Sequence, residues 1–480
     1  MAANSIIEQK PLFQQLPVGQ EIVYVVSNTT AVANESKVKF VASVHISSTT
    51  PANPNTTTDL IGTFKTTPNN AGVGIFDFRN IVENYVKADN LAANGSTYKT
   101  TATSDNNRHP LHLIDKYSLN NNVVRYLTIK FEVEYLGATD TSGNQDPNIV
   151  RTQAGTDATS LPYTIFNGYL KYTDHLTMGT GINANNFGYS LVDFYASSTG
   201  KKFLTNAPTI QYANLEDYGT LSYFAPIENI AENIHNIKFT YYDSTGTPIG
   251  TPDVVYRTQA NGAYNTFNSD VNKQIIHVGC FPGNLQNWST NFNNLVTLGT
   301  IQGGYYTVQA FDSGGFGVTQ SYTINVNCPD GKGFESIRLC WLNQWGVWDY
   351  YTFRKKSIRT ISTKGSTYQQ LAGTWNESIY RLDGFKGGKK TFRVNATEKI
   401  SMNTDLISED DNVIFEELIN SPEVYQLEGF QTDTFSALNQ YVTPVRLTTS
   451  SFTKKTIAND KLIQYTFEIE KSKTLRTQSI

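Results

Sequence analysis

The stretch Lys37-Val38-Lys39-Phe40-Val41-Ala42-Ser43-Val44-His45-Ile46 decides the fold class of this chain. Apolar side chains recur at every second position along it, and the set that shares one face is Val38, Phe40, Ala42, Val44 and Ile46. This alternation predicts an extended strand with one buried face. Such a strand is typical of an antiparallel sheet, because a strand of a parallel sheet is buried on both faces and is apolar throughout.

Similar segments recur along the chain between clusters of Gly, Asn, Pro and Ser. The clearest further strands are Glu21–Ser27, Arg125–Tyr135, Ile237–Tyr242, Gln274–Val278, Tyr305–Phe311, Thr319–Asn327 and Leu462–Glu470. Helical spacing is found over Asn80–Lys87, where Asn80 would be the cap, and over about 409–420, before Pro422. We therefore expect a mainly β fold of antiparallel β-sandwich domains with a few short helices.

The length of 480 residues calls for several domains, since single hydrophobic cores stop growing at about 250–300 residues. Breaks in the strand pattern are expected near Pro226 and near Pro329. We expect an N-terminal β domain with long polar loops over 1–225 and an immunoglobulin-like β-sandwich over 226–328. The third expected domain, 329–480, is a β domain with the helix at about 409–420, and it would supply the assembly contacts.

Composition excludes some classes of protein. The charged fraction is 17%, below the roughly 25% of ordinary soluble domains. The net charge of -4 argues against a general nucleic-acid binder, which would be basic. Cys280, Cys328 and Cys340 are an odd number without Cys-x-x-Cys spacing, which favours synthesis in a reducing compartment. A secretory signal and a membrane segment are not expected, because no apolar run has the necessary length.

No residue pattern predicts catalysis, a cofactor or a metal site. Glu132 and Glu134 share a strand face, but alternation places that face toward solvent. His109 and His112 lack the further ligands that a zinc site needs. Gly72-Val73-Gly74 is not followed by the Lys of a phosphate loop, so a turn explains it better. We therefore expect a protein that is not an enzyme.

Three of the five tryptophans lie within the aromatic segment Cys340–Phe353. The pattern predicts a hairpin, with Trp345 in the turn. Buried aromatic side chains most often form a core, and a subunit interface or a stacking platform for a ligand are the alternatives. We expect Trp341 and Trp348 to hold the C-terminal domain together and Trp345 to be free to reach a neighbouring molecule.

Two adjacent blocks of opposite charge follow this segment. Residues 351–400 carry eleven Lys or Arg and three acids, a net charge of +8, whereas 401–430 carry eight acids and no Lys or Arg. The blocks are either complementary faces of one folded domain or the two sides of a head-to-tail contact between identical subunits. The interaction residues predicted on the second reading are Trp345, Arg354, Lys355, Lys356, Arg359, Glu409, Asp410 and Asp411.

Several C-terminal phrases together resemble virion structural proteins of tailed bacteriophages, particularly β-rich tail or baseplate components. The phrases are Ile337–Phe353, Leu418–Tyr425, Tyr441–Val445, Lys454–Thr456 and Gln464–Phe467. The resemblance implies assembly of many copies into a ring or sleeve around the tail axis, with other copies and other virion proteins as partners. It also implies synthesis in the host cytoplasm, followed by incorporation into the virion.

We therefore expect a non-enzymatic structural component of a bacteriophage virion, in the tail, baseplate or neck. A receptor- or glycan-binding fibre or adhesin is the first alternative, because Tyr, Asn and Trp also form sugar-binding sites. A capsid decoration protein is the second, since the sequence does not separate a head component from a tail component. A glycosidase ranks third and would require two acids that converge in a cleft.

Overall fold

The computed structural model describes residues 5–47, 58–86, 111, 117–119, 124–136, 150–152, 158–194, 201–225, 234–256, 274–326, 334–374, 376–428, 442–451, 453–456, 463–473 and 475–476. The chain forms two compact units. The first is Met1–Asn327 with Asn343–Asp349, and the second is Cys328–Leu342 with Tyr350–Ile480. The prediction of a mainly β, multi-domain chain with a few short helices is confirmed.

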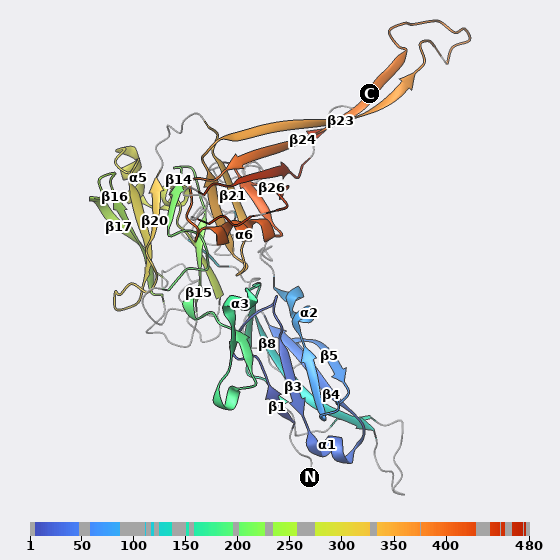
Figure 1. Cartoon of the computed structure of the whole chain (residues 1–480), viewed down its shortest axis with the longest axis vertical. Coiled ribbons are helices and arrows are strands. Elements are labelled where there is room, and N and C mark those ends of the chain that lie inside the picture. Colours follow the sequence, from blue (N-terminus) through green and yellow to red (C-terminus); the bar gives the residue numbers. More distant parts are fainter. Residues whose placement is uncertain are drawn as a thin grey trace. The chain divides into compact units, whose positions relative to one another are not determined.

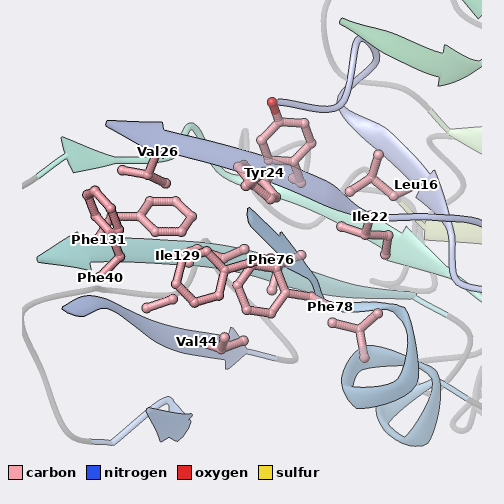
Figure 2. Close-up of a cluster of buried hydrophobic side chains, with 14 of the residues drawn as sticks. Leu16, Ile22, Tyr24, Val26, Phe40, Val44, Phe76, Phe78, Ile129 and Phe131 are labelled. Carbon is pink, nitrogen blue, oxygen red and sulfur yellow. The ribbon is translucent and has the colours of Figure 1, made fainter. Parts of the chain in front are cut away.

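The first unit contains two sheets that share one core. Three antiparallel strands form one sheet in the order β1-β3-β6, and the other has the order β2-β11-β8-β4-β5, with β9 and β10 paired to β8. The bounds are β1 (Ile6–Gln9), β2 (Gln15–Pro17), β3 (Val23–Ser27), β4 (Ser36–Ser47), β5 (Leu60–Thr66), β6 (Val73–Asp77), β8 (Val124–Leu136), β9 (Val150–Thr152), β10 (Ala158–Thr159) and β11 (Tyr163–Phe166). Figure 2 shows side chains from both sheets gathered in this core, among them Tyr24, Phe40, Phe76 and Phe131.

The stretch that predicted the fold class is β4. It pairs antiparallel with both β5 and β8. Four of the five side chains assigned to its apolar face are buried, and the fifth, Ile46, is half-buried. The antiparallel prediction is therefore confirmed, and β4 is a central strand that anchors this part of the first unit.

Among its described residues, the rest of the first unit has three further sheets. A two-stranded ribbon joins β12 and β13, a three-stranded sheet has the order β15-β18-β7, and a five-stranded sheet has the order β14-β20-β19-β16-β17. The bounds are β7 (Tyr117–Leu119), β12 (Leu176–Met178), β13 (Phe187–Tyr189), β14 (Ile210–Ala213), β15 (Thr220–Ala225), β16 (Asn236–Tyr242), β17 (Pro248–Tyr256), β18 (Gln274–Gly279), β19 (Tyr305–Phe311) and β20 (Tyr322–Val326).

This arrangement differs from the predicted domain boundary at 225/226. β14 pairs with β20, and β15 pairs with β18 along its whole length. Strands from residues 210–225 therefore complete two sheets whose other members come from the middle segment. Because the pairing crosses the boundary, 226–328 is not an independent immunoglobulin-like sandwich.

The second unit contains one large antiparallel sheet. Its order is β22-β21-β25-β26-β27-β24-β23, with β28 paired to β24. The bounds are β21 (Ile337–Leu342), β22 (Trp348–Phe353), β23 (Ser357–Gln370), β24 (Gly388–Asn403), β25 (Val424–Leu427), β26 (Val442–Leu447), β27 (Thr466–Lys471) and β28 (Leu475–Arg476). In Figure 1 the orange ends of β23 and β24 extend beyond the other strands of their own sheet.

The helices are short, and both predicted ones have shifted starts. The bounds are α1 (Thr29–Asn34), α2 (Arg79–Val82), η1 (Glu83–Tyr85), α3 (Tyr172–His175), η3 (Gly181–Asn183), η4 (Val192–Phe194), α4 (Pro282–Trp288), α5 (Thr290–Thr297) and α6 (Asn412–Asn420). Asn80 is not a cap, because α2 already begins at Arg79. α6 begins at Asn412 because the preceding residues form a turn, in which Asp411 Oδ2 accepts the Ser408 N–H at 3.0 Å.

Candidate functional site

Glu132 and Glu134, which share one face of β8, each form an ion pair with a lysine. Glu132 lies 3.2 Å from Lys130, and Glu134 pairs with Lys65. Each carboxylate is therefore engaged in an ion pair, Glu132 within β8 and Glu134 with a residue of β5. His109 and His112 lie outside the described residues. Across the described residues, no three or more His, Cys, Asp or Glu side chains are grouped in a way that could hold a metal ion.

A buried Ser–His pair, which the sequence did not reveal, connects β15 and β18. Ser222 Oγ and His277 Nδ1 lie 2.7 Å apart, and both residues are buried. Burial lowers the pKa of His277 to about 3. A nucleophile–base pair needs an orienting group on the second ring nitrogen, and His277 Nε2 has no such partner among the described residues. The pair is therefore a core hydrogen bond.

The turn at the centre of the aromatic segment is held by a polar network. Asn343 Oδ1 accepts the N–H groups of Trp345 and Val347 at 3.1 and 3.2 Å. Its Nδ2 donates to the Leu204 carbonyl at 2.9 Å and to Asp349 at 3.1 Å. Because Asn343 and Asp349 are themselves buried, this network fixes the turn as part of the first unit.

Trp345 is fully buried in that unit. It is 0% exposed, and its ring lies 4.7 Å from that of Phe194 within an apolar cluster. The prediction that Trp345 is free to reach a neighbouring molecule is therefore wrong, because residues distant in the sequence enclose the turn. Trp341 is buried in the second unit, whereas Trp348 belongs to the first, because the division between the units falls inside β22, after Asp349.

The basic run after the segment is partly neutralised within the second unit. Arg354 pairs with Asp405 at 2.8 Å, and Lys355 lies 3.6 Å from the same carboxylate. Arg359 binds Glu335 and Glu398. The hydrogen bond that the Arg359 guanidinium donates to the Glu335 carboxylate raises the pKa of Arg359 and lowers the pKa of Glu335.

The remaining predicted residues lie at the surface. Lys356, Glu409 and Asp410 are exposed, and Asp411 is half-buried by the turn before α6. In the same acidic block, Glu416 pairs with Lys454 at 2.7 Å. The ion pairs of Arg354 and Lys355 fit the reading in which the charge blocks are complementary faces of one domain, and Lys356 and Asp410 lie exposed beside them in the sequence.

The structure adds a surface that the sequence did not single out. We call it the arm, and it consists of β23, β24 and the described residues that join them. β23 is 14 residues long, which corresponds to about 46 Å at roughly 3.3 Å per residue. Most of its side chains are exposed. We call the described residues between the end of β23 at Gln370 and the start of β24 at Gly388 the arm tip. The arm tip carries large exposed apolar side chains: Leu371 (64%), Ile379 (64%), Tyr380 (58%), Leu382 (74%) and Phe385 (78%).

Comparison with known proteins does not identify the chain. No family model matches it, and no curated protein matches it. Among solved structures, a mutant of Salmonella alpha-2-macroglobulin is similar at 8% identity and a TM-score of 0.15. The match covers 100% of this chain and 34% of that one, and a TM-score this low does not define a shared fold. No helix within the described residues has the length and apolar composition needed to cross a bilayer.

Proposed function

We propose that the chain is a non-enzymatic structural subunit that assembles in multiple copies in a bacteriophage virion, as a ring or sleeve of the tail, baseplate or neck. The observation that carries the proposal is the arm. Monomeric soluble proteins rarely expose contiguous apolar patches of large area, and such a patch is typical of an interaction site. The arm tip presents five large apolar side chains on one extended element.

The rest of the proposal is supported by the resemblance of the C-terminal phrases and by the β-rich architecture. Nothing in the described residues favours a catalytic role, since the carboxylates and the Ser–His pair are accounted for by ion pairs and by the core. The proposed subunit acts by binding copies of itself and neighbouring virion proteins.

The test is the state of assembly of the purified protein and its presence in particles. Sedimentation velocity and native mass spectrometry should show a defined oligomer. Cryo-electron microscopy of the particle that contains the protein should show repeated copies around an axis. A protein that stays monomeric at every concentration and is absent from purified particles would contradict the proposal.

A glycan-binding role remains a second candidate because the first unit exposes aromatic rings. Tyr169 and Tyr172 are 71% and 64% exposed, and exposed aromatic faces are the usual platforms for sugar rings. A glycan array should then report binding that Tyr169→Ala and Tyr172→Ala abolish. Trp345→Ala does not discriminate between these roles, because Trp345 is buried.

A further inference from the structure

The two faces of the arm have different chemistry. In the β23–β24 register, Ser362 lies opposite Thr397, Lys364 opposite Asn395, Ser366 opposite Arg393 and Tyr368 opposite Lys390. Directly opposed residues point to the same face, and residues two apart along a strand share it. Lys364 and Arg393 therefore lie on one face. Lys390 lies on it as well, because a register shift between Ser366 and Thr367 places Lys390 opposite Tyr368. We call this the basic face. Its ladder from Ser362 to Tyr368 contains no carboxylate.

The three cations Lys364, Lys390 and Arg393 form no ion pair within the described residues, although Lys390 Nζ donates to the Phe385 carbonyl at 3.1 Å. Nearer the base of the arm, Lys399 on the same face pairs with Glu468. The opposite face differs, because Glu398 lies there and binds Arg359. The distal arm thus offers a strip of three cations next to the apolar tip.

The arm has little support from its own unit. β24 pairs with β27 over Lys399–Asn403 and with β28 at Asn395–Ala396. Between these contacts and the arm tip, β23 and β24 pair only with each other among the described strands. An isolated two-stranded hairpin is marginally stable in water, and a third strand or a packed face is needed for independent stability. The distal arm therefore gains order when a partner covers it.

The chain itself carries the complementary surface. Residues 401–430 contain eight acids and no Lys or Arg. Asp405, Glu416 and Glu428 pair with cations of their own unit, and Glu417 is buried. Asp410, just before α6, and Glu423, just after it, are both exposed. Charge complementarity between a basic strip and an acidic surface of the same molecule favours head-to-tail contacts between identical copies, which form rings when the rotation closes.

We infer that the arm of one copy docks on the acidic surface around α6 of a second copy, with Lys364, Lys390 and Arg393 facing Asp410 and Glu423 and with the apolar tip buried against that copy. This inference rests on the proposed function, since it specifies the contact by which the subunit assembles. It commits to a second copy as the partner because both complementary surfaces belong to this chain.

The experiment uses two charge-reversed forms of the full chain. The arm-reversed form carries Lys364→Glu, Lys390→Glu and Arg393→Glu, and the acid-reversed form carries Asp410→Lys and Glu423→Lys. Self-association is measured by sedimentation equilibrium and native mass spectrometry. Each form alone should associate about tenfold or more weakly than wild type, since like charges then meet across the contact. An equimolar mixture should regain association as alternating copies, because every contact in it is complementary again.

A matched control separates the face from the net charge. Arg393→Glu on the basic face should weaken association, whereas Lys389→Glu on the opposite face of the same strand should leave it within about twofold of wild type. All these positions are at the surface, so far-ultraviolet circular dichroism and thermal unfolding should match wild type and exclude misfolding.

The outcomes separate the two proposals. If wild type assembles and the arm-reversed form assembles equally well, or the mixture does not recover, the arm contact is wrong and the proposed function stands. If wild type is monomeric at every concentration and absent from particles, both fail. If wild type binds anionic phospholipid vesicles through the arm, and the charge reversals leave self-association unchanged, the partner of the arm is a membrane surface and the inference is overturned.

Discussion

Trp345→Ala tests the finding that the aromatic turn is core. A buried Trp removes about 150–250 Å² from water, and at about 25 cal/mol per Å² this corresponds to roughly 4–6 kcal/mol. Trp345 Nε1 has no hydrogen-bond partner among the described residues, and truncation relieves that cost of about 1–3 kcal/mol. We therefore expect a loss of about 3 kcal/mol, which agrees with the roughly 3–5 kcal/mol of other Trp→Ala core changes.

The assay is urea unfolding followed by far-ultraviolet circular dichroism, with the midpoint of the first transition as the readout. A loss of about 3 kcal/mol lowers the midpoint by about 1 M for an m-value near 3 kcal/mol/M. Phe385→Ala is the control, because a ring that is 78% exposed should change stability by no more than about 0.5 kcal/mol. A loss below about 1 kcal/mol for Trp345→Ala, together with loss of assembly, would refute the burial argument and restore Trp345 as a contact residue.

Three further predictions use the same unfolding assay. Gly346→Ala should cost about 2 kcal/mol or more, because Gly346 has φ 72° and a Cβ there would lie 1.8 Å from the Asn167 carbonyl oxygen; an unchanged midpoint would contradict the close approach. Burial lowers the pKa of His277 to about 3 in the folded state, whereas the same side chain in the unfolded chain binds a proton below about pH 6.5. As the pH is lowered from about 6.5 to about 3, the free energy of unfolding should therefore decrease by up to about 1.4 kcal/mol per pH unit. His277→Asn should flatten that slope. Arg359→Met should lower the free energy of unfolding by less than about 1 kcal/mol at neutral pH. Because Arg359 lowers the pKa of Glu335 below 4.5 in the folded state, the stability that this pair contributes is present above pH 4.5 and is lost as the pH falls through the folded-state pKa of Glu335. The unfolding midpoints of wild type and variant should therefore become equal in acid.

Strands with one apolar face could be predicted because the information is local. Tyr305–Phe311 has the same bounds in the sequence pattern and in the structure. The predicted strand Thr319–Asn327 begins later, at Tyr322, because Thr319 uses its hydroxyl to accept the Ala310 N–H and does not continue the ladder. Period-two alternation thus locates a strand, and side-chain hydrogen bonds adjust where it starts.

The position of Trp345 could not be predicted, because its environment is not local. The residues that enclose it include Phe194 and Leu204, which lie about 140 to 150 positions earlier in the chain. The sequence shows a turn with a Trp, and turns are usually exposed. Long-range packing reversed that expectation, as it did for the boundary at 225/226, where β14 and β15 join sheets with strands that follow much later.

The distribution of polar and apolar residues in the arm is the reverse of that in an ordinary hairpin, and this reversal is informative. In an ordinary hairpin the strands are apolar on one face and the connection is polar. Here β23 is mostly Ser, Thr, Gln and charged residues, and the connection carries Leu371, Ile379, Leu382 and Phe385. A chain that folds alone gains nothing by placing apolar side chains where its own core cannot cover them, because exposed apolar area is unfavourable in water. Such a placement is stabilising only when another surface covers the tip, so a polar ribbon with an apolar end is itself a sequence signal for assembly.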